Sequence, residues 1–146
     1  MPIVVKESYS TAVDVHSIAW GAAIVEVSVD KTTYKPTIKG IWSCFDIGDI
    51  VDEDTTKRFI TQRILDSLYW CNDYNDSEFS QWSFASKPIS INLINSQGTK
   101  DVNYCGDLPL AIIPAAFCSA INQAIGKNIH TLPVTPEKIY RMVEGQ

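Results

Sequence analysis

The sequence predicts an α+β domain in which a mostly antiparallel or mixed sheet of about four strands packs against two main helices, in the order β-β-α-β-α. Two observations carry this prediction. In the predicted strand at residues 18–29, two sets of residues alternate from Ala23 to Asp30, as in a strand with one buried face, and residues 37–46 favour a second strand because they are rich in Ile, Trp and Phe. Apolar residues recur at spacings of three and four over residues 54–72 and 108–125, as in helices that bury one face.

The first two strands are predicted to form an antiparallel hairpin. In the first strand, Val25 and Val27 share a face that alternates with Glu26. The polar residues 30–33 favour a turn between the strands. Pro36 stands just before the second strand, a position where proline is tolerated.

The first helix is predicted near residues 54–72. Asp52, Glu53 and Asp54 fall at its start, where the helix dipole favours negative charge, so we interpret them as first-turn acids rather than a metal cluster. One apolar stripe is expected to face the core. It consists of Ile60, Ile64, Leu65, Leu68 and Cys71.

Two further extended segments follow the first helix. Residues 89–93 alternate apolar and polar residues and predict a strand, which ends in a turn at residues 95–98. Residues 79–85 carry aromatic side chains at alternating positions, and this pattern fits either a further strand or an extended arm.

The last long helix is predicted at residues 108–125. Pro109 suits its first turn, Gly126 suits its C-terminal cap, and Pro114 is expected to kink or delay it. Its buried face is expected to consist of Leu110, Ile113, Phe117, Ile121 and Ala124. A short terminal helix through about residue 143 is predicted after the cap residue Thr135.

Composition limits the kinds of partner. The 146 residues are predicted to form a single domain with an irregular lead-in at residues 1–16. The net charge of −5 and the scattered Lys and Arg argue against a nucleic-acid partner and against an anionic membrane surface. No apolar segment approaches the ~20 residues of a membrane span, and the start does not resemble a signal peptide. We therefore expect a cytoplasmic protein.

The cysteines do not form a metal-binding or disulfide pattern. Cys44, Cys71, Cys105 and Cys118 include no CxxC pair, and the sequence holds only two histidines. We therefore expect no metal bound directly by side chains, and reduced thiols.

The segment Cys105-Gly106-Asp107 opens the last long helix and allows two interpretations. Asp107 is either an ordinary helix-capping carboxylate or a carboxylate presented to a ligand from a rigid helix start. Gly106 fits a tight turn before the helix. Cys105 is either a reactive thiol, because thiol pKa falls at helix starts, or a buried inert cysteine.

One face of the predicted sheet has no helix assigned to it. Four aromatic residues are candidates for that face, namely Trp20, Tyr34, Trp42 and Trp82. A wide apolar patch there would indicate a partner, since monomers rarely expose much contiguous apolar area.

From about residue 17 to the end, several segments together resemble the C-terminal segment of the molybdenum-binding subunit of the molybdenum hydroxylases, the xanthine dehydrogenase and aldehyde oxidase family. The isoquinoline-oxidoreductase-like branch is the most similar. In order, the matching segments are Val25-Glu26-Val27-Ser28-Val29-Asp30, Cys44-Phe45-Asp46-Ile47-Gly48, Val51-Asp52-Glu53, Tyr104-Cys105-Gly106-Asp107 and Ala124-Ile125-Gly126-Lys127-Asn128-Ile129 followed by Leu132-Pro133.

The resemblance implies roles for three residues. Asp107 occupies the position of the family's catalytic glutamate, a general base beside the molybdenum centre, but its side chain is one methylene shorter. Cys105 and Gly106 would lie on the cofactor side. The family's glycine-rich run near the pterin is replaced here by Thr61-Gln62-Arg63 and Ser67-Leu68-Tyr69, which should obstruct the cofactor.

The resemblance therefore implies a fragment or subunit of an oxidoreductase that hydroxylates an electrophilic carbon of a heterocycle or aldehyde. The molybdenum–molybdopterin cofactor is expected only in complex with a larger molybdenum-binding subunit, and the isolated chain is expected to be inactive. The alternative is a non-catalytic interaction or homo-oligomerisation domain that kept the fold and lost the cofactor site.

Overall fold

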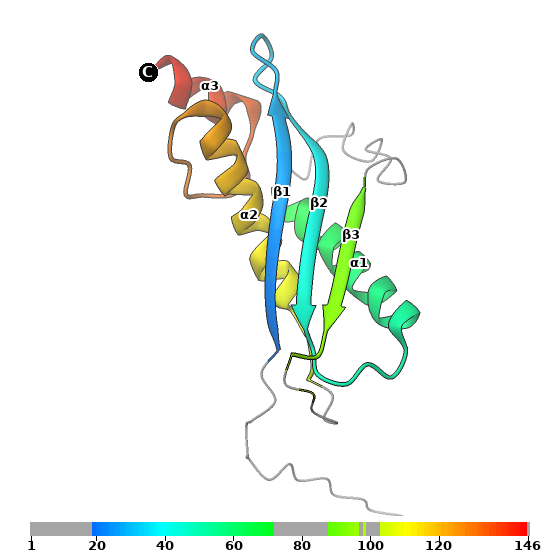
Figure 1. Ribbon diagram of the computed structural model, residues 1–146. Helices are drawn as coiled ribbons and strands as arrows, with labels where there is room; N and C mark the ends of the chain where they lie inside the picture. Colours follow the sequence, from blue (N-terminus) through cyan, green and yellow to red (C-terminus); the bar gives the residue numbers. More distant parts are fainter. Residues whose placement is uncertain (1–18, 72–87, 97, 99–102, 146) are drawn as a thin grey trace, which may run out of the picture.

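The computed structural model describes residues 19–71, 88–96, 98 and 103–145. These residues form three strands and three helices, joined by turns and loops. In chain order they are β1 (Trp20–Val29), β2 (Pro36–Asp46), α1 (Glu53–Cys71), β3 (Ile89–Ile94), α2 (Leu108–Ile125) and α3 (Pro136–Glu144) (Figure 1). The α+β class is confirmed, with three strands in the described residues instead of about four. The lead-in at 1–16 and the aromatic stretch at 79–85 lie outside the described residues.

The sheet is mixed, with the strand order β1-β2-β3. β1 and β2 form the predicted antiparallel hairpin, in which Ile24 lies opposite Trp42. The carboxylate of Asp30 accepts hydrogen bonds from the backbone N–H groups of Thr32 (2.9 Å) and Thr33 (2.7 Å), so the predicted turn is confirmed. β3 runs parallel to β2, because the chain crosses over through α1 and returns to the same end of the sheet.

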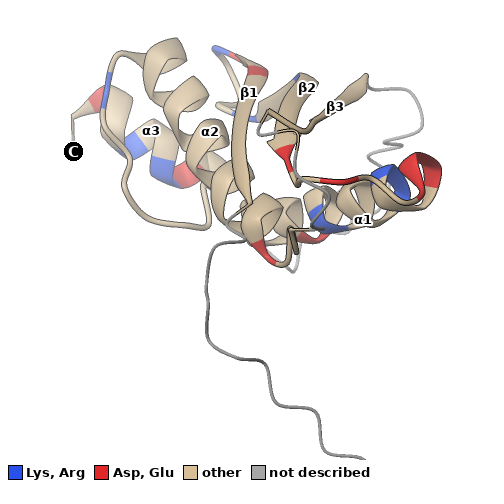
Figure 2. Cartoon of the chain, turned by 60° about the horizontal axis from the view of Figure 1, so that its bottom comes forward, with Lys and Arg blue, Asp and Glu red and all other residues tan. Residues whose placement is uncertain are grey.

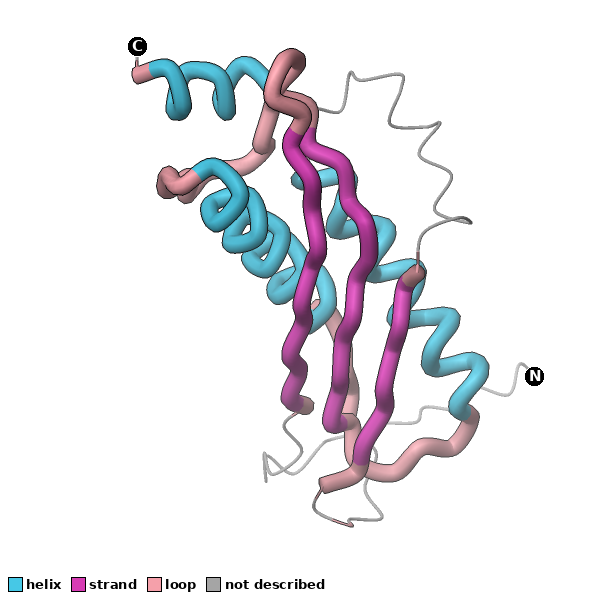
Figure 3. Tube along the Cα trace, turned by 45° about the horizontal axis from the view of Figure 1, so that its top comes forward, coloured by secondary structure: helices cyan, strands magenta, loops and turns pink. Residues whose placement is uncertain are grey.

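One face of the sheet is covered by the two long helices. α1 and α2 lie side by side behind the strands in Figures 1 and 3, with α2 packed against β1. The predicted stripe of α1 is confirmed, because Ile60, Ile64, Leu68 and Cys71 are buried, while Leu65 is only partly buried. The core therefore lies between this face of the sheet and the two helices.

The buried row of α2 differs slightly from the prediction. Ile113, Phe117 and Ile121 are buried as expected, but Ala124 is exposed. Residues four apart lie almost in line on a helix, so Ile125 continues the row of Phe117 and Ile121 and packs against the core in place of Ala124. The expected delay at Pro114 is also wrong, since α2 runs from Leu108 through this buried proline.

The ends of the helices follow the predicted chemistry. Gly126 closes α2 in the left-handed conformation (φ 66°), and its N–H donates to the carbonyl of Asn122. Thr135 caps α3 by accepting a hydrogen bond from the N–H of Lys138. These two caps mark the end of α2 and the start of α3.

The length and composition of α2 would suffice to cross a membrane, contrary to the sequence-based expectation. Its mean hydropathy is 1.6 over 18 residues. Part of this apolar character comes from small, exposed residues such as Ala111 and Ala115. The packing of α2 against β1 and α1 accounts for its larger apolar side chains.

Candidate functional site

The functional candidates gather at one end of the sheet. β2 and β3 end there, and α1 and α2 begin there (Figure 1). Helix starts offer unpaired backbone N–H groups, and ligands of folds with parallel strands commonly bind beyond the carboxyl ends of the strands. The motif residues at positions 44–48 and 104–107 lie at this end.

Asp46 ties the end of β2 to the turn after β3. The hydroxyl of Ser96 donates to the carboxylate of Asp46, and the backbone N–H groups of Ser96 (3.4 Å) and Gly48 (3.5 Å) also lie within reach. The hydrogen bond from the Ser96 hydroxyl is the main cause that lowers the pKa of Asp46. The carboxylate of Asp46 therefore has a structural role, because it connects the end of β2 to the turn after β3.

A backbone bridge brings two of the sequence motifs together. The N–H of Asn103 donates to the carbonyl of Ile47 (2.8 Å), and the N–H of Ile47 donates to the carbonyl of Ile94 (3.3 Å). Residues 44–48 and 104–107 are far apart in the sequence, yet this bridge holds them at one edge. Their proximity makes this edge the candidate site.

Asp107 stands at the cap position of α2, but its side chain makes no capping hydrogen bond. Its backbone carbonyl accepts from the N–H of Ala111 (3.2 Å), whereas the residue itself is exposed. The backbone of Asp107 (φ −93°, ψ 13°) lacks the extended geometry that turns a capping side chain onto the first turn. The capping interpretation is therefore wrong for the side chain, although the position is right.

Gly106 forms the predicted tight turn. Its φ of +52° lies in the left-handed region, which favours glycine. A Cβ atom at this position would also lie 3.0 Å from the ring of Tyr104. Any other residue at position 106 would therefore be strained in this backbone conformation and would press on the exposed ring of Tyr104.

Cys105 is buried, and burial raises the pKa of its thiol to about 11. Burial therefore favours the interpretation of Cys105 as a buried, inert cysteine. All four cysteines are free in the structure.

Native protein at pH 7.5 is expected to leave Cys105 and Cys71 unmodified by iodoacetamide, because the thiolate is the nucleophile and both thiols stay protonated. Burial also raises the pKa of Cys71, to about 12. Peptide mass spectrometry after a timed reaction measures the labelling of each cysteine. Protein unfolded in urea is the control and should be labelled at every cysteine, whereas rapid labelling of Cys105 in native protein would contradict the burial argument.

A small cavity lies beside the motif, between the loop before α1 and the segment before α2. Its volume is about 320 Å³, and its lining is mostly apolar. The lining residues are Ile47, Asp49, Val51, Thr55, Thr56, Phe59, Asn103, Tyr104 and Cys105. Of the three predicted site residues, Cys105 belongs to the lining, whereas Gly106 and Asp107 do not.

Sequence reasoning missed Val51, Phe59 and Tyr104 as parts of this cavity. Val51 is 85% exposed and Tyr104 is 78% exposed, which is unusual for large apolar side chains. The position of Tyr104 directly before the Cys105-Gly106-Asp107 segment could have indicated that it lies near the site. Nothing in the local sequence indicated that Val51 and Phe59 lie near it.

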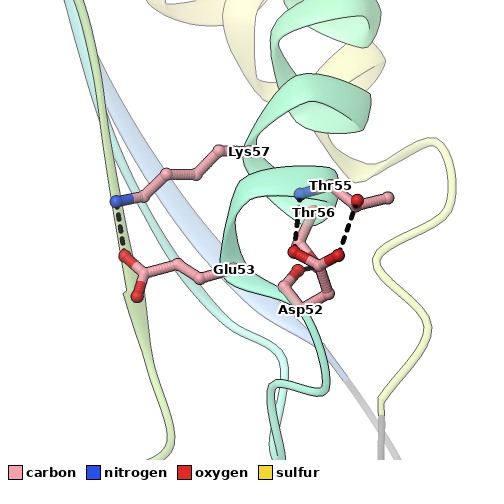
Figure 4. Close-up of polar contacts among 5 residues, drawn as sticks. All are labelled: Asp52, Glu53, Thr55, Thr56 and Lys57. Atoms are coloured by element: carbon pink, nitrogen blue, oxygen red, sulfur yellow. Dashed lines mark hydrogen bonds and ion pairs between the residues drawn. The ribbon is translucent and has the colours of Figure 1, made fainter.

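The start of α1 is stabilised by its own polar contacts (Figure 4). The carboxylate of Asp52 accepts hydrogen bonds from the N–H (3.0 Å) and the hydroxyl (2.8 Å) of Thr55, and these bonds lower its pKa. Glu53 pairs with Lys57 at 2.5 Å. These contacts confirm first-turn acids, and no group that could hold a metal ion is found among the described residues.

Negative charge surrounds this end of the molecule. Acidic residues lie at the end of β2, in the loop that follows it and at the starts of α1 and α2 (Figure 2). They are Asp46, Asp49, Asp52, Glu53, Asp54 and Asp107. The cavity lining includes no Lys or Arg. Among the described residues the acidic side chains at this end outnumber the basic ones, Lys57 and Arg58 at the start of α1, so the local charge does not favour an anionic ligand.

The described residues do not by themselves fit the anionic pterin cofactor that the resemblance implies. The positions of the family's glycine-rich run lie within α1, where Thr61 donates to the carbonyl of Lys57 and Ser67 donates to the carbonyl of Ile64. Leu68 is fully buried. These side chains fill space that glycines would leave open, so the middle and the C-terminal half of α1 offer no glycine-lined surface to the cofactor.

Comparison with known proteins identifies the fold. No family model and no curated protein matches the sequence. Among solved structures, the aldehyde oxidoreductase of Desulfovibrio gigas aligns with a TM-score of 0.71 and 24% identity over 86% of this chain. The aldehyde oxidoreductase of Desulfovibrio desulfuricans gives 0.67 and 26% over 86%, and the quinoline 2-oxidoreductase of Pseudomonas putida 86 gives 0.65 and 21% over 81%.

These three enzymes are molybdenum hydroxylases, so the resemblance inferred from the sequence motifs is confirmed. The chain spans only 15–18% of the length of the solved chains that it matches. It therefore has the fold of one segment of these enzymes.

Proposed function

We propose that this chain, which has the fold of a segment of the molybdenum hydroxylases, is a subunit of such an oxidoreductase and works in the cytoplasm with a larger, separately encoded molybdenum-binding subunit. The complex would hydroxylate an electrophilic carbon of an aldehyde or a nitrogen heterocycle. The larger subunit would hold the cofactor, whose chemistry when bound is the oxidation of the substrate carbon. This chain would supply Asp107, with Cys105 and Gly106 beside it.

The placement of Asp107 is the observation that supports this proposal best. Its carboxylate lies at the rigid start of α2, is exposed and is not used for capping the helix. A carboxylate that makes no capping hydrogen bond can accept a proton from a substrate or from water. The buried turn at Gly106 holds the backbone that carries it.

The acidic end and the filled glycine positions favour a second candidate function. In that case the chain is a non-catalytic interaction domain that kept the fold and lost the contact with the cofactor. The absence of Lys and Arg from the cavity lining supports this candidate. The two functions differ in whether a molybdenum-containing partner exists.

A tagged chain purified from its native cells, grown with molybdate, tests the choice between them. We expect a larger protein to co-purify in near-equal amount and to carry molybdenum, as measured by mass spectrometry of protein and metal. The complex should oxidise aldehydes or nitrogen heterocycles with a dye as the electron acceptor. The chain produced alone in a heterologous host is the control and should contain no molybdenum.

Two results would change the conclusion. Near-stoichiometric molybdenum in the isolated chain would show that no partner is needed to hold the cofactor. Failure to recover a molybdenum-containing partner from molybdate-grown cells would rule out the enzyme subunit and leave the interaction domain.

A further inference from the structure

We propose that the face of the sheet that none of the described helices covers is the surface through which this chain binds the larger molybdenum subunit, an inference that rests on the proposed function. We call this surface the open face. It consists of Trp20, Ala22 and Ile24 on β1, Trp42 and Cys44 on β2, and Ile94 on β3. In Figures 1 and 3, α1 and α2 both lie on the opposite side of the sheet.

The register of the strands brings these residues together. Ile24 lies opposite Trp42, Ala22 lies opposite Cys44, and Cys44 in turn lies opposite Asn92. Neighbouring side chains of a strand point to opposite faces, so the buried Val25 and Ile41 face the helices while Ile24 and Trp42 face away from them. Ala22, Ile24, Trp42 and Cys44 thus form a contiguous apolar surface across β1 and β2. Asp46, which lies opposite both Trp20 and Ile94, places a carboxylate between these two residues at the end of the open face.

The indole of Trp42 lies across its own strand. A Cβ atom on Gly40 would come within 2.4 Å of this indole, so the glycine leaves the room that the ring occupies. The ring therefore extends the apolar surface along β2, toward the polar residues Lys39 and Glu26. Rings held in this way lose little conformational entropy when a partner covers them.

The exposure of this surface is unusual for the solvent side of a sheet. Ile24 is 69% exposed, Trp20 is 62% exposed and Trp42 is 40% exposed. The outer face of a half-buried sheet normally carries polar residues, and here Ser90 and Asn92 on β3 and Glu26 on β1 do so. An apolar centre with tryptophan and a polar border is typical of a protein–protein interface.

The extent of the matched chains indicates which partner covers the open face. Enzymes with this fold carry it as 15–18% of a longer chain, so in them the segment is accompanied by several times its own mass of protein. When one face of a sheet is packed against helices and the other face is also apolar, the second face is normally buried against a further layer of protein. We therefore assign the open face to the larger subunit rather than to a second copy of this chain.

The substitution Ile24→Asp tests this assignment in the tagged complex from molybdate-grown cells. Ile24 is exposed in the chain, so the variant should fold, as circular dichroism and thermal unfolding would show. A carboxylate buried without a partner in an interface is costly, and recovery of the molybdenum-containing subunit should fall at least about tenfold. Met142→Asp on α3 is the matched control, because Met142 is also exposed (36%) but lies outside the open face, and it should retain the partner.

Hydrogen exchange gives a second measurement on the unmodified chain. Backbone amides of residues 20–24 and 42–46 should exchange more slowly in the complex than in the isolated chain. Undiminished recovery of the partner with Ile24→Asp, or unchanged exchange in these residues, would overturn the interface and leave the proposed function intact. Recovery of no molybdenum-containing partner by the wild-type chain would overturn both. A homodimer of the isolated chain that Ile24→Asp converts to monomers would assign the open face to a second copy and overturn the proposal.

Discussion

Replacing Phe45 by alanine is expected to lower the free energy of unfolding by about 3–5 kcal/mol. The ring of Phe45 is fully buried beneath β2. A Cβ atom on Gly21 would lie 2.8 Å from this ring and 3.1 Å from the side chain of Leu108, so the three residues meet closely. The ring thus fills the space between β1, β2 and the first residue of α2. Domains of this size have total stabilities of about 5–15 kcal/mol, so the loss would be a large share.

Urea denaturation followed by circular dichroism measures this loss. Lys39→Ala is the matched control, because Lys39 lies on the same strand but is exposed, and it should change stability by no more than about 0.5 kcal/mol. A loss below about 1 kcal/mol for Phe45→Ala would contradict the role of this ring. The variant should also weaken any function of Asp107, because Leu108 directly follows it and loses its packing partner.

Much of the fold could be predicted from local pattern. The alternation of residues in β1, the turn chemistry of Asp30 and the spacing of the α1 stripe each specify local structure, and the structure agrees with all three. The parallel direction of β3 could not be read from its own six residues. Direction depends on the path of the chain between elements, and alternation is the same for both directions.

The candidate site was only partly predictable, for a related reason. The motif at Gly106 and Asp107 carries local signals of a turn and a helix start, and both are present. Whether the carboxylate caps the helix depends on the φ and ψ of Asp107, which residue type alone does not determine. The cavity combines side chains from three separate segments, including Val51 and Phe59, so only the packed structure reveals it.

Asp107→Asn is expected to reduce turnover of the assembled complex by about 10²–10⁴-fold, the usual contribution of a general base. An amide keeps the size of the side chain but does not accept a proton at neutral pH. Because Asp107 makes no capping hydrogen bond, the substitution should leave the thermal stability of the chain and its recovery in the complex unchanged. Steady-state kinetics on the purified complex, with molybdenum content measured in the same samples, gives the effect per loaded site.

Asp107→Glu separates a catalytic role from a merely structural one. The resemblance places a glutamate at this position, and misplacement of a reacting group by about 1 Å can cost on the order of 10²-fold in rate. Restoring the missing methylene should therefore raise turnover above that of the wild-type complex. Asp54→Asn removes a carboxylate from the same acidic end and should leave turnover within about twofold, since general electrostatic effects of exposed charges are small. Retained turnover in Asp107→Asn would exclude Asp107 from the chemistry, and equal losses in Asp107→Asn and Asp54→Asn would attribute its effect to the negative charge of this end.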